Sequence, residues 1–212
     1  MAIALPASPF LYPILDAAFS ENILRDAAAL MDAGIQILQI RAKAWNKARV
    51  YETLSVLDPE CNERNVILVV NDCLDVAMIS QSAGVHLGQT DFPVAEARKL
   101  VPDRIVGVST HNERQFLIAN GWPVNYIAIG PMYRTSTKPE AGPGLGTAFL
   151  ESMRKASDLP IVCIGGIGPS KFRELIHSGA NGIAMISEFY KGNDLYSSAR
   201  RLMDQLHSTT HS

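Results

Sequence analysis

Three polar side chains alternate along one short segment. Gln39, Arg41 and Lys43 are each separated by one apolar residue. In an extended segment, residues two positions apart project to the same side, so all three are expected on one face. A guanidinium and an ammonium beside an amide suit a polyanion, because arginine matches phosphate oxygens with paired hydrogen bonds. Single basic residues at strand ends are usually solvated, but this spacing, together with Lys138 in a later loop, favours a phosphate site.

Two aspartates, Asp72 and Asp91, follow neighbouring predicted strands and are expected to converge near these cations. Carboxylates that face a phosphate site are typical of Mg²⁺, which proteins bind through few carboxylates plus substrate phosphates. A structural alternative exists for each residue. Asp72 could cap a helix that begins near Cys73, and Asp91 could cap the helix that Pro93 enters. Because both carboxylates lie beside the cations, a joint metal site is the preferred interpretation.

A glycine pair, Gly165-Gly166, ends another predicted strand and precedes a predicted helix. Backbone N–H groups at such a turn can approach an anion without interference from a Cβ atom, assisted by a helix N-terminus. Glycine pairs are also ordinary turn residues, but a position after the seventh strand of a barrel favours a phosphate site. Neutral donors to the same or an adjacent anion are available from Thr135, Ser136, Thr137 and Ser187.

No nucleophilic side chain is identified. His111 is a candidate general base, because histidine titrates near neutral pH, although a loop histidine at the start of a helix is the slightly preferred interpretation. His86 lies inside a short apolar strand and is expected to be a hydrogen-bonded core residue. Cys163 has no basic neighbour in the sequence that would activate it.

These groups follow short apolar runs that alternate with longer amphipathic ones, the pattern of repeated β-then-α units. The runs predicted as strands are 10–15, 35–40, 66–70, 85–87, 105–108, 126–129, 161–164 and 183–186. The segments predicted as helices are 22–33, 47–57, 73–82, 93–100, 112–120, 147–156, 170–178 and 195–206.

About eight such units in 212 residues predict an α/β fold of the closed (β/α)8 TIM-barrel type, whose active site lies where the strands end. An open doubly wound sheet usually has fewer strands and often a glycine-rich first turn. The turn after the first predicted strand contains no glycine. Without a linker or a break in composition, residues 1–212 are predicted to form a single domain, and the polar tail 207–212 is expected to fray.

The bulk composition narrows the function classes. A net charge of −2 gives no electrostatic reason to expect nucleic acid binding. Neither a signal peptide nor a long apolar stretch is evident, so we expect a cytoplasmic protein that does not bind membranes. The three cysteines are far apart, which favours free thiols over a disulfide or zinc site. The expected partners are small molecules.

The motifs together resemble those of the thiamine-phosphate synthase family over nearly the whole chain. The family's QxRxK motif is similar to 39–43, its ND pair to 71–72 and its HxGQxD motif to 86–91. Its GVSTH segment resembles 107–111, and its GPxxxTxTK segment resembles 130–138. The glycine pair after the seventh strand and the serine after the eighth also match.

The resemblance implies a transferase that joins an aminopyrimidine diphosphate to a thiazole phosphate, releasing pyrophosphate and using Mg²⁺ on Asp72 and Asp91. The residues implied for the pyrimidine diphosphate are Gln39, Arg41, Lys43, Asn71, Ser109 and Lys138. Of these, the catalytic ones are Arg41, Lys43, Ser109 and Lys138. The residues implied for the thiazole phosphate are Thr135, Ser136, Thr137, Gly166, Ile186 and Ser187.

Two positions depart from the family's pattern. The first strand usually ends in Thr-Asp, where this chain has Leu15-Asp16. After the eighth strand the usual small residues are replaced by Glu188-Phe189, and we expect Glu188 to turn outward or to begin the following helix.

Two alternative functions are compatible with a barrel of this kind. A related thiazole tautomerase would move a proton with a histidine near His111, and a non-catalytic sensor would only bind thiamine phosphate. The cationic run and the aspartate pair are superfluous to an isomerase, and a sensor would tolerate their loss, so their presence favours the synthase. A homodimer, and a lid formed by residues 139–146, are left open by the sequence.

Overall fold

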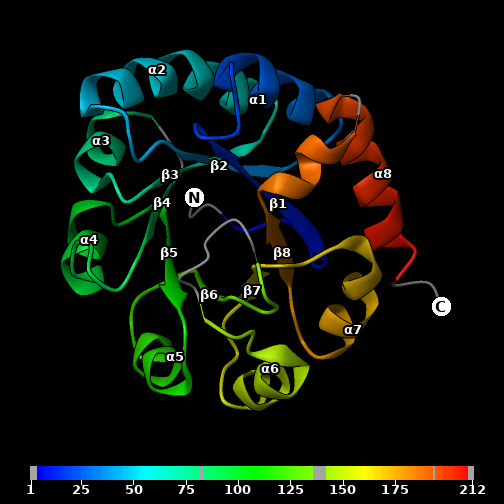
Figure 1. Cartoon of the computed structure of the whole chain (residues 1–212). Helices are drawn as coiled ribbons and strands as arrows, with labels where there is room; N and C mark the ends of the chain where they lie inside the picture. The colour runs from blue at the N-terminus through cyan, green and yellow to red at the C-terminus, as the bar shows by residue number, and fades with distance from the viewer. Residues whose placement is uncertain (1–3, 82–83, 136–141, 193, 210–212) are drawn as a thin grey trace.

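The computed structural model describes residues 4–81, 84–135, 142–192 and 194–209. Eight parallel strands form one closed barrel in chain order, each hydrogen-bonded to the next and β8 to β1. Figure 1, viewed down the barrel, shows the helices as an outer ring around the strands. The chain is therefore a single (β/α)8 domain, as the alternation of apolar and amphipathic segments predicted.

The strands are β1 (Phe10–Asp16), β2 (Ile37–Arg41), β3 (Ile67–Asn71), β4 (Gly84–Leu87), β5 (Ile105–Thr110), β6 (Tyr126–Ile129), β7 (Ile161–Ile164) and β8 (Gly182–Met185). The α-helices are α1 (Ile23–Asp32), α2 (Lys47–Glu63), α3 (Leu74–Ile79), α4 (Val94–Leu100), α5 (Glu113–Asn120), α6 (Gly146–Lys155), α7 (Phe172–His177) and α8 (Leu195–His207). Two short 3₁₀ helices, η2 (Pro169–Lys171) and η3 (Ser187–Lys191), follow β7 and β8.

One helix is longer than its sequence predicted. Helix α2 was expected to end at Leu57, but it continues to Glu63 through Pro59. Proline removes one backbone hydrogen bond inside a helix. The extension is compensated by burial of Cys61, whose thiol lies 3.7 Å from the sulfur of Met31 on α1.

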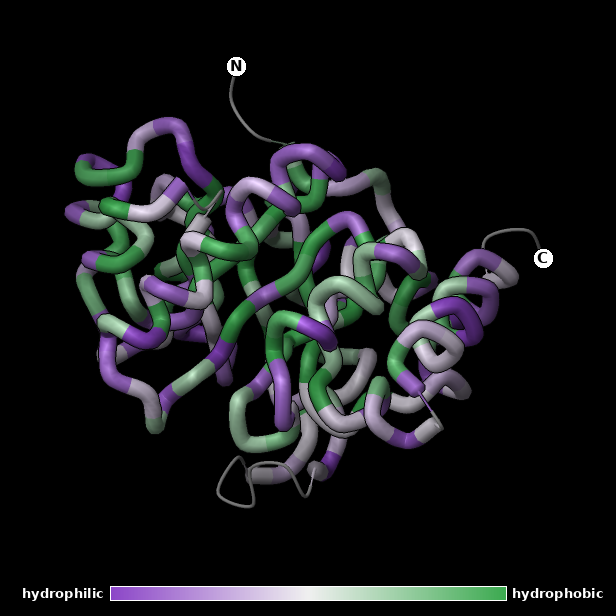
Figure 2. The backbone as a smooth tube through the Cα atoms, turned by 90° about the horizontal axis from the view of Figure 1, so that it is seen from above, coloured by the Kyte–Doolittle hydropathy of each residue, from purple (hydrophilic) through white to green (hydrophobic). Residues whose placement is uncertain are grey.

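Alternation along the strands divides the apolar side chains into two layers. On β1, Leu11 and Leu15 belong to the larger cluster between strands and helices. Phe10, Tyr12 and Ile14 belong to a smaller cluster inside the barrel, against which Leu5 also packs. Figure 2 shows hydrophobic and hydrophilic stretches alternating along the outer helices, as expected where one helix face packs on the barrel.

The last residues that the structure describes lie at the end of helix α8. Helix α8 extends to His207, and the buried Thr209 donates a hydrogen bond to the carbonyl of Leu206 at 2.7 Å. This contact satisfies a terminal carbonyl of the helix, and the fraying expected for 207–212 stays a prediction. Residues 210–212 lie outside the described part. Among the described helices, none has the length and apolar character needed to cross a bilayer.

Candidate active site

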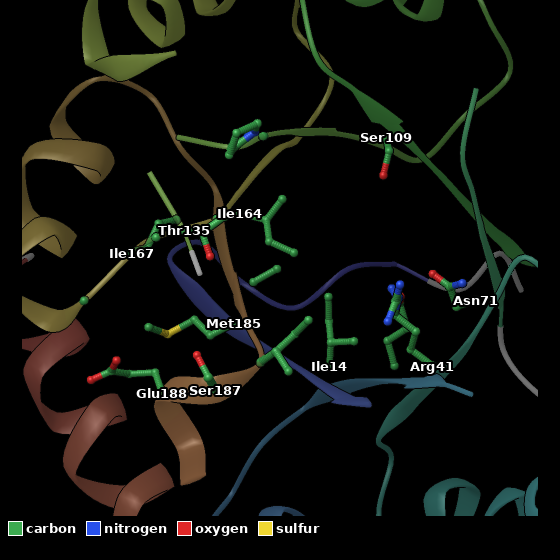
Figure 3. A pocket seen from close by; sticks show the side chains of 18 of the residues that line it. Ile14, Arg41, Asn71, Ser109, Thr135, Ile164, Ile167, Met185, Ser187 and Glu188 are labelled. Carbon is green, nitrogen blue, oxygen red and sulfur yellow. The ribbon is translucent and has the colours of Figure 1, made fainter. Parts of the chain in front are cut away.

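A cavity of about 480 Å³ opens where the strands end. Figure 3 shows Arg41, Asn71 and Ser109 on one side of it and Thr135, Ser187 and Glu188 on the other. Its polar and glycine lining is Gln39, Arg41, Asn71, His86, Ser109, His111, Gly130, Arg134, Thr135, Gly165, Gly166, Gly168, Ser187, Glu188 and Lys191. Side chains and turns from β2 to β8 thus converge on one space, as expected for the active end of such a barrel.

Arg41 is held by a residue for which the sequence predicted no role. Asp16, the last residue of β1, lies opposite Arg41 in the parallel register and forms an ion pair with its guanidinium. The second carboxylate oxygen of Asp16 accepts a hydrogen bond from the N–H of Ala18 at 3.0 Å. Asp16 is almost fully buried, so this pairing fixes Arg41 at the mouth of the cavity. The sequence signal for this position is its spacing: Asp16 lies two residues after Ile14, which faces the inside of the barrel.

Lys43 lies differently from Gln39 and Arg41. Strand β2 ends at Arg41, so Lys43 is outside the extended segment and does not line the cavity. The expectation that all three residues share one face is therefore wrong for Lys43, because the chain turns before it. Its ammonium instead lies 3.2 Å from a carboxylate oxygen of Asp72.

Asp72 and Asp91 come together, and neither caps a helix. The N-cap residue of α3 is Cys73 and that of α4 is Pro93. Neither N-cap makes a side-chain hydrogen bond to its helix. Asp91 accepts a hydrogen bond from the N–H of Gly88 at 2.6 Å. Burial raises the pKa of the Asp91 carboxyl above its ordinary value, and the adjacent Asp72 raises it further. Both capping alternatives are wrong.

This carboxylate pair fits a divalent cation that also takes substrate oxygens. Asp72 has a φ of 62°, a left-handed conformation that is uncommon outside glycine and typical of functional positions. Besides burial, the nearby Asp72 raises the pKa of the Asp91 carboxyl because two negative charges repel each other. A cation bound between the two carboxylates would relieve this repulsion. Within the described residues, no group of three or more acidic, histidine or cysteine side chains could hold a metal alone. Such a site would therefore depend on ligand phosphates.

A line of buried hydrogen bonds runs beneath the cavity. The amide nitrogen of Gln39 donates to the Tyr12 hydroxyl at 3.0 Å, and the hydroxyls of Tyr12 and Tyr126 are 3.0 Å apart. Tyr126 is 2.8 Å from Nδ1 of His86, whose Nε2 is 2.7 Å from the Ser109 hydroxyl. His86 is thus a hydrogen-bonded core histidine, as predicted. Tyr12 and Tyr126 were missed, because nothing in the sequence places them together.

The opposite side of the cavity contains a glycine turn among its lining side chains. Gly165 and Gly166, after β7, have φ values of 97° and 66°. A Cβ atom on Gly166 would lie 2.5 Å from the carbonyl oxygen of Arg134, so the turn packs directly on the loop after β6. Only glycine fits here. The helix N-terminus expected behind this turn is displaced, because η2 stands between the glycines and α7.

The residues after β8 do not behave as expected. Ser187 begins η3, and Glu188 lies beside it in Figure 3. The Glu188 side chain is only 12% exposed and lines the cavity, 2.6 Å from the ammonium of Lys191. Glu188 does begin the following helical turn, but it does not turn outward. Its pairing with Lys191 is what permits a carboxylate at this position.

His111 is oriented by its own contacts. Its Nδ1 lies 2.6 Å from the carbonyl oxygen of Gly130, which can only accept, so Nδ1 carries the proton. His111 precedes Asn112, whose side chain accepts from the N–H of Gln115 and so caps α5. The preferred interpretation of a loop histidine at a helix start agrees with this, although the ring also lines the cavity. Cys163 is fully buried, and burial raises the pKa of its thiol.

Eight of the residues implied by the resemblance line this one cavity: Gln39, Arg41, Asn71, Ser109, Thr135, Gly166, Ile186 and Ser187. Lys43, Asp72 and Asp91 contact one another but do not line the cavity. Ser136, Thr137 and Lys138 lie outside the described residues. Arg134 and Lys191 line the cavity but were not predicted, since each is a single basic residue without a spacing pattern.

Comparisons with known proteins agree with this geometry. Residues 11–189 match the family model described as thiamine monophosphate synthase. The thiamine-phosphate synthase of Methanospirillum hungatei is 36% identical over 180 residues, which cover 84% of this chain and 87% of that protein. The thiamine-phosphate synthase of Chloroflexus aurantiacus is 35% identical, with 91% of this chain and 90% of that protein covered.

Solved structures are also similar to this chain. The thiamine phosphate pyrophosphorylase of Pyrococcus furiosus superposes with a TM-score of 0.85 at 26% identity, covering 94% of this chain and 96% of that one. A second structure, titled native KDPGal, has a TM-score of 0.76 but 13% identity, so it supports the fold alone. The matched length, the identities and the convergence of the motif residues lead to one conclusion: this chain belongs to the thiamine monophosphate synthase family.

Proposed function

We propose that this chain joins an aminopyrimidine methyl diphosphate to a thiazole phosphate, making thiamine phosphate and releasing pyrophosphate. The observation that carries the proposal is a single cavity with two chemically different polar sides. One side is lined by Arg41 and Asn71, and the neighbouring Asp72 pairs with Lys43 and lies beside Asp91 outside the lining. The other side has a glycine turn, the hydroxyls of Thr135 and Ser187, and the charged residues Arg134, Glu188 and Lys191. A reaction between two phosphorylated rings needs two such anion regions facing one space.

The charged side suits the diphosphate. In this proposal Arg41, Lys43 and Lys138 neutralise it, and Asp72 and Asp91 hold Mg²⁺. Bound there, Mg²⁺ would supply charge neutralisation to the leaving diphosphate. Two ion pairs support the roles of Arg41 and Lys43. Asp16 holds Arg41 in the cavity lining, and Lys43 contacts Asp72 of the carboxylate pair.

The pyrimidine ring would lie between the diphosphate region and the buried hydrogen-bond line. Gln39, Asn71 and Ser109 line the cavity there, and each has a polar group available for a heterocycle. The thiazole phosphate would be held across the cavity. Its proposed donors are Thr135, Ser136, Thr137, Gly166, Ile186 and Ser187.

The proposed chemistry needs no nucleophilic side chain. The bond between the pyrimidine methylene carbon and the diphosphate oxygen breaks, and the diphosphate leaves with the electron pair. The electron-rich aminopyrimidine stabilises the resulting cation, and the thiazole nitrogen donates its lone pair to the methylene carbon. No proton is removed. The protein's contribution is to align the two rings and to stabilise the leaving charge.

The test is to incubate the purified protein with both phosphorylated precursors and Mg²⁺ and to measure thiamine phosphate and pyrophosphate. We expect equal amounts of the two products, and none when either precursor is omitted. Consumption of the thiazole alone would indicate the isomerase, and binding of thiamine phosphate without turnover would indicate the sensor. Either result would overturn the proposal.

This function carries expectations about context. The partners are two small molecules, with no role for nucleic acid or a membrane, and the reaction takes place in the cytoplasm. A homodimer is a further expectation. Sedimentation of the purified protein, with and without substrates, measures its oligomeric state directly.

A further inference from the structure

The buried hydrogen-bond line crosses the barrel from β2 to β5. Gln39, Tyr12, Tyr126, His86 and Ser109 belong to five different strands, and successive polar atoms are 2.7 to 3.0 Å apart. The two tyrosines are at most 1% exposed. Only the two ends, Gln39 and Ser109, have proposed contacts with substrate. The middle of the line therefore has no assigned role.

Packing holds the middle of the line in one arrangement. The rings of Tyr12 and Tyr126 meet edge to face with centroids 5.9 Å apart, and the His86 ring stacks on Tyr126 at 5.6 Å. Gly107 on β5 makes room for this, because a Cβ atom there would lie 2.1 Å from the Tyr126 ring. Burial also raises the pKa of both tyrosine hydroxyls, so each keeps its proton and can donate.

Such a line can have only one direction at a time. A hydroxyl that accepts from one neighbour passes its own hydrogen to the next, and a neutral imidazole has one donor and one acceptor nitrogen. The amide nitrogen of Gln39 can only donate, so Tyr12 accepts from it and donates to Tyr126. Continued in this direction, Tyr126 would donate to Nδ1 of His86, and Nε2 of His86 would donate to Ser109, which requires the tautomer protonated at Nε2.

The direction of the line fixes what each end offers to a ligand. Gln39 donates from its amide nitrogen to Tyr12, so the amide oxygen of Gln39 remains as an acceptor for the ligand. Ser109 accepts from His86, so its own hydrogen is free to be donated. An aminopyrimidine needs this combination, because its amino group donates and its ring nitrogens accept. In the corresponding oxopyrimidine the carbonyl accepts and the adjacent ring N–H donates.

We propose that Tyr12, Tyr126 and His86 are positioning residues that make Gln39 an acceptor and Ser109 a donor, and so select an amino- over an oxopyrimidine diphosphate. The inference rests on the proposed contacts of Gln39 and Ser109 with the pyrimidine. Sites that hydrogen-bond a substrate reject the analogue that leaves their buried polar groups unpaired.

The first test measures the direction of the line without any substrate. In protein labelled with ¹⁵N-histidine, nitrogen NMR distinguishes a protonated from an unprotonated ring nitrogen. We expect His86 to be the neutral tautomer with its proton on Nε2. A His86→Phe variant identifies the His86 signals by their loss. A proton on Nδ1, or on both nitrogens, overturns the inference.

The second test interrupts the line at its centre. Tyr126→Phe removes one hydroxyl that the proposal keeps out of contact with substrate. Tyr51→Phe, on the exposed face of α2, is the matched control. We expect the KM for the aminopyrimidine diphosphate to rise about tenfold in Tyr126→Phe, as for loss of one well-placed hydrogen bond. The KM for the thiazole phosphate should stay the same.

Discrimination is the most specific result. The ratio of kcat/KM for the aminopyrimidine over the oxopyrimidine diphosphate should fall about tenfold in Tyr126→Phe and not in the control. A purely structural role predicts equal changes for both pyrimidines and for the thiazole phosphate, which would overturn the inference. Failure of the unmodified protein to form thiamine phosphate would instead overturn the proposed function, while the tautomer of His86 remains measurable in either case.

Discussion

The two sides of the cavity that are proposed to bind anions are built in different ways. Around β2, β3 and β4, acidic and basic side chains are held by specific partners: Asp16 fixes Arg41, and Lys43 reaches Asp72. Around β6, β7 and β8, the framework is a glycine turn packed on another loop, and the charged residues Glu188 and Lys191 already neutralise each other. This difference predicts where a single substitution should change substrate binding or turnover most. We expect the charged side to depend more strongly on individual side chains than the side around β6, β7 and β8, here called the backbone side.

The largest effect is expected at the carboxylate pair. Asp91→Asn removes a charge but keeps an acceptor for the N–H of Gly88. We expect kcat/KM to fall by about 10²–10³-fold, as when one preorganised electrostatic group is lost at a site of developing charge. Initial rates of pyrophosphate release against Mg²⁺ concentration measure this. Asp103→Asn, on the surface, is the control, and near-normal turnover in Asp91→Asn would contradict the role.

A smaller effect is expected from the partner of Arg41. Asp16→Asn breaks an ion pair that is largely buried, whereas Asp32→Asn breaks an exposed pair with Arg64. Loss of one partner of a buried pair costs several kcal/mol, so we expect the free energy of unfolding to fall by about 2–3 kcal/mol in Asp16→Asn. The Asp32→Asn change should cost less than about 1 kcal/mol.

The same Asp16→Asn variant should also bind its diphosphate substrate less well. Because Arg41 is no longer fixed, we expect the KM for the pyrimidine diphosphate to rise about tenfold, equivalent to about 1.4 kcal/mol. Urea unfolding and initial rates check the two effects. Equal stability of the Asp16→Asn and Asp32→Asn proteins would show that the burial of the first pair is unimportant.

On the backbone side a hydroxyl should contribute less. Ser187→Ala removes one neutral donor from a region that keeps its glycine turn, so the loss is about 1 kcal/mol. We expect the KM for the thiazole phosphate to rise about fivefold, with the pyrimidine diphosphate unaffected. Steady-state kinetics with each substrate varied in turn measure this, against Ser152→Ala on the outer face of α6. If Ser187→Ala lowered kcat/KM as much as Asp91→Asn, the distinction between the two sides of the cavity would be wrong.

The smallest effect should be a gain. Glu188→Gln releases Lys191 from its carboxylate partner, so the KM for the thiazole phosphate should fall by about threefold. Glu96→Gln is the matched control, because Glu96 and Lys99 form an exposed pair with the same three-residue spacing. A rise in this KM would mean that Glu188 itself helps to bind the thiazole.

The fold was predictable because burial on both faces makes parallel strands read as continuous apolar runs. The strand starting at Tyr126 has the same bounds in sequence and structure. The carboxylates were predictable for the same reason, since each follows such a run. What local sequence could not indicate was pairing across the barrel. Tyr12 and Tyr126 are 114 positions apart, and only the closed sheet brings their hydroxyls together.

Glu188 illustrates the other limit. A lone acid after β8 was expected to avoid an anion pocket, but Lys191 one helical turn later provides a partner that makes its burial tolerable. The spacing was visible in the sequence. Its meaning depended on both residues facing the cavity, which the 3₁₀ geometry of η3 determines.

The central claim is that the two sides of one cavity hold two different substrates. The most direct measurement is the KM for each substrate in the unmodified, Asp16→Asn and Ser187→Ala proteins. The account predicts a crossed result: Asp16→Asn raises only the KM for the pyrimidine diphosphate, and Ser187→Ala raises only that for the thiazole phosphate. If either variant raises both values by the same factor, the division of the cavity is wrong.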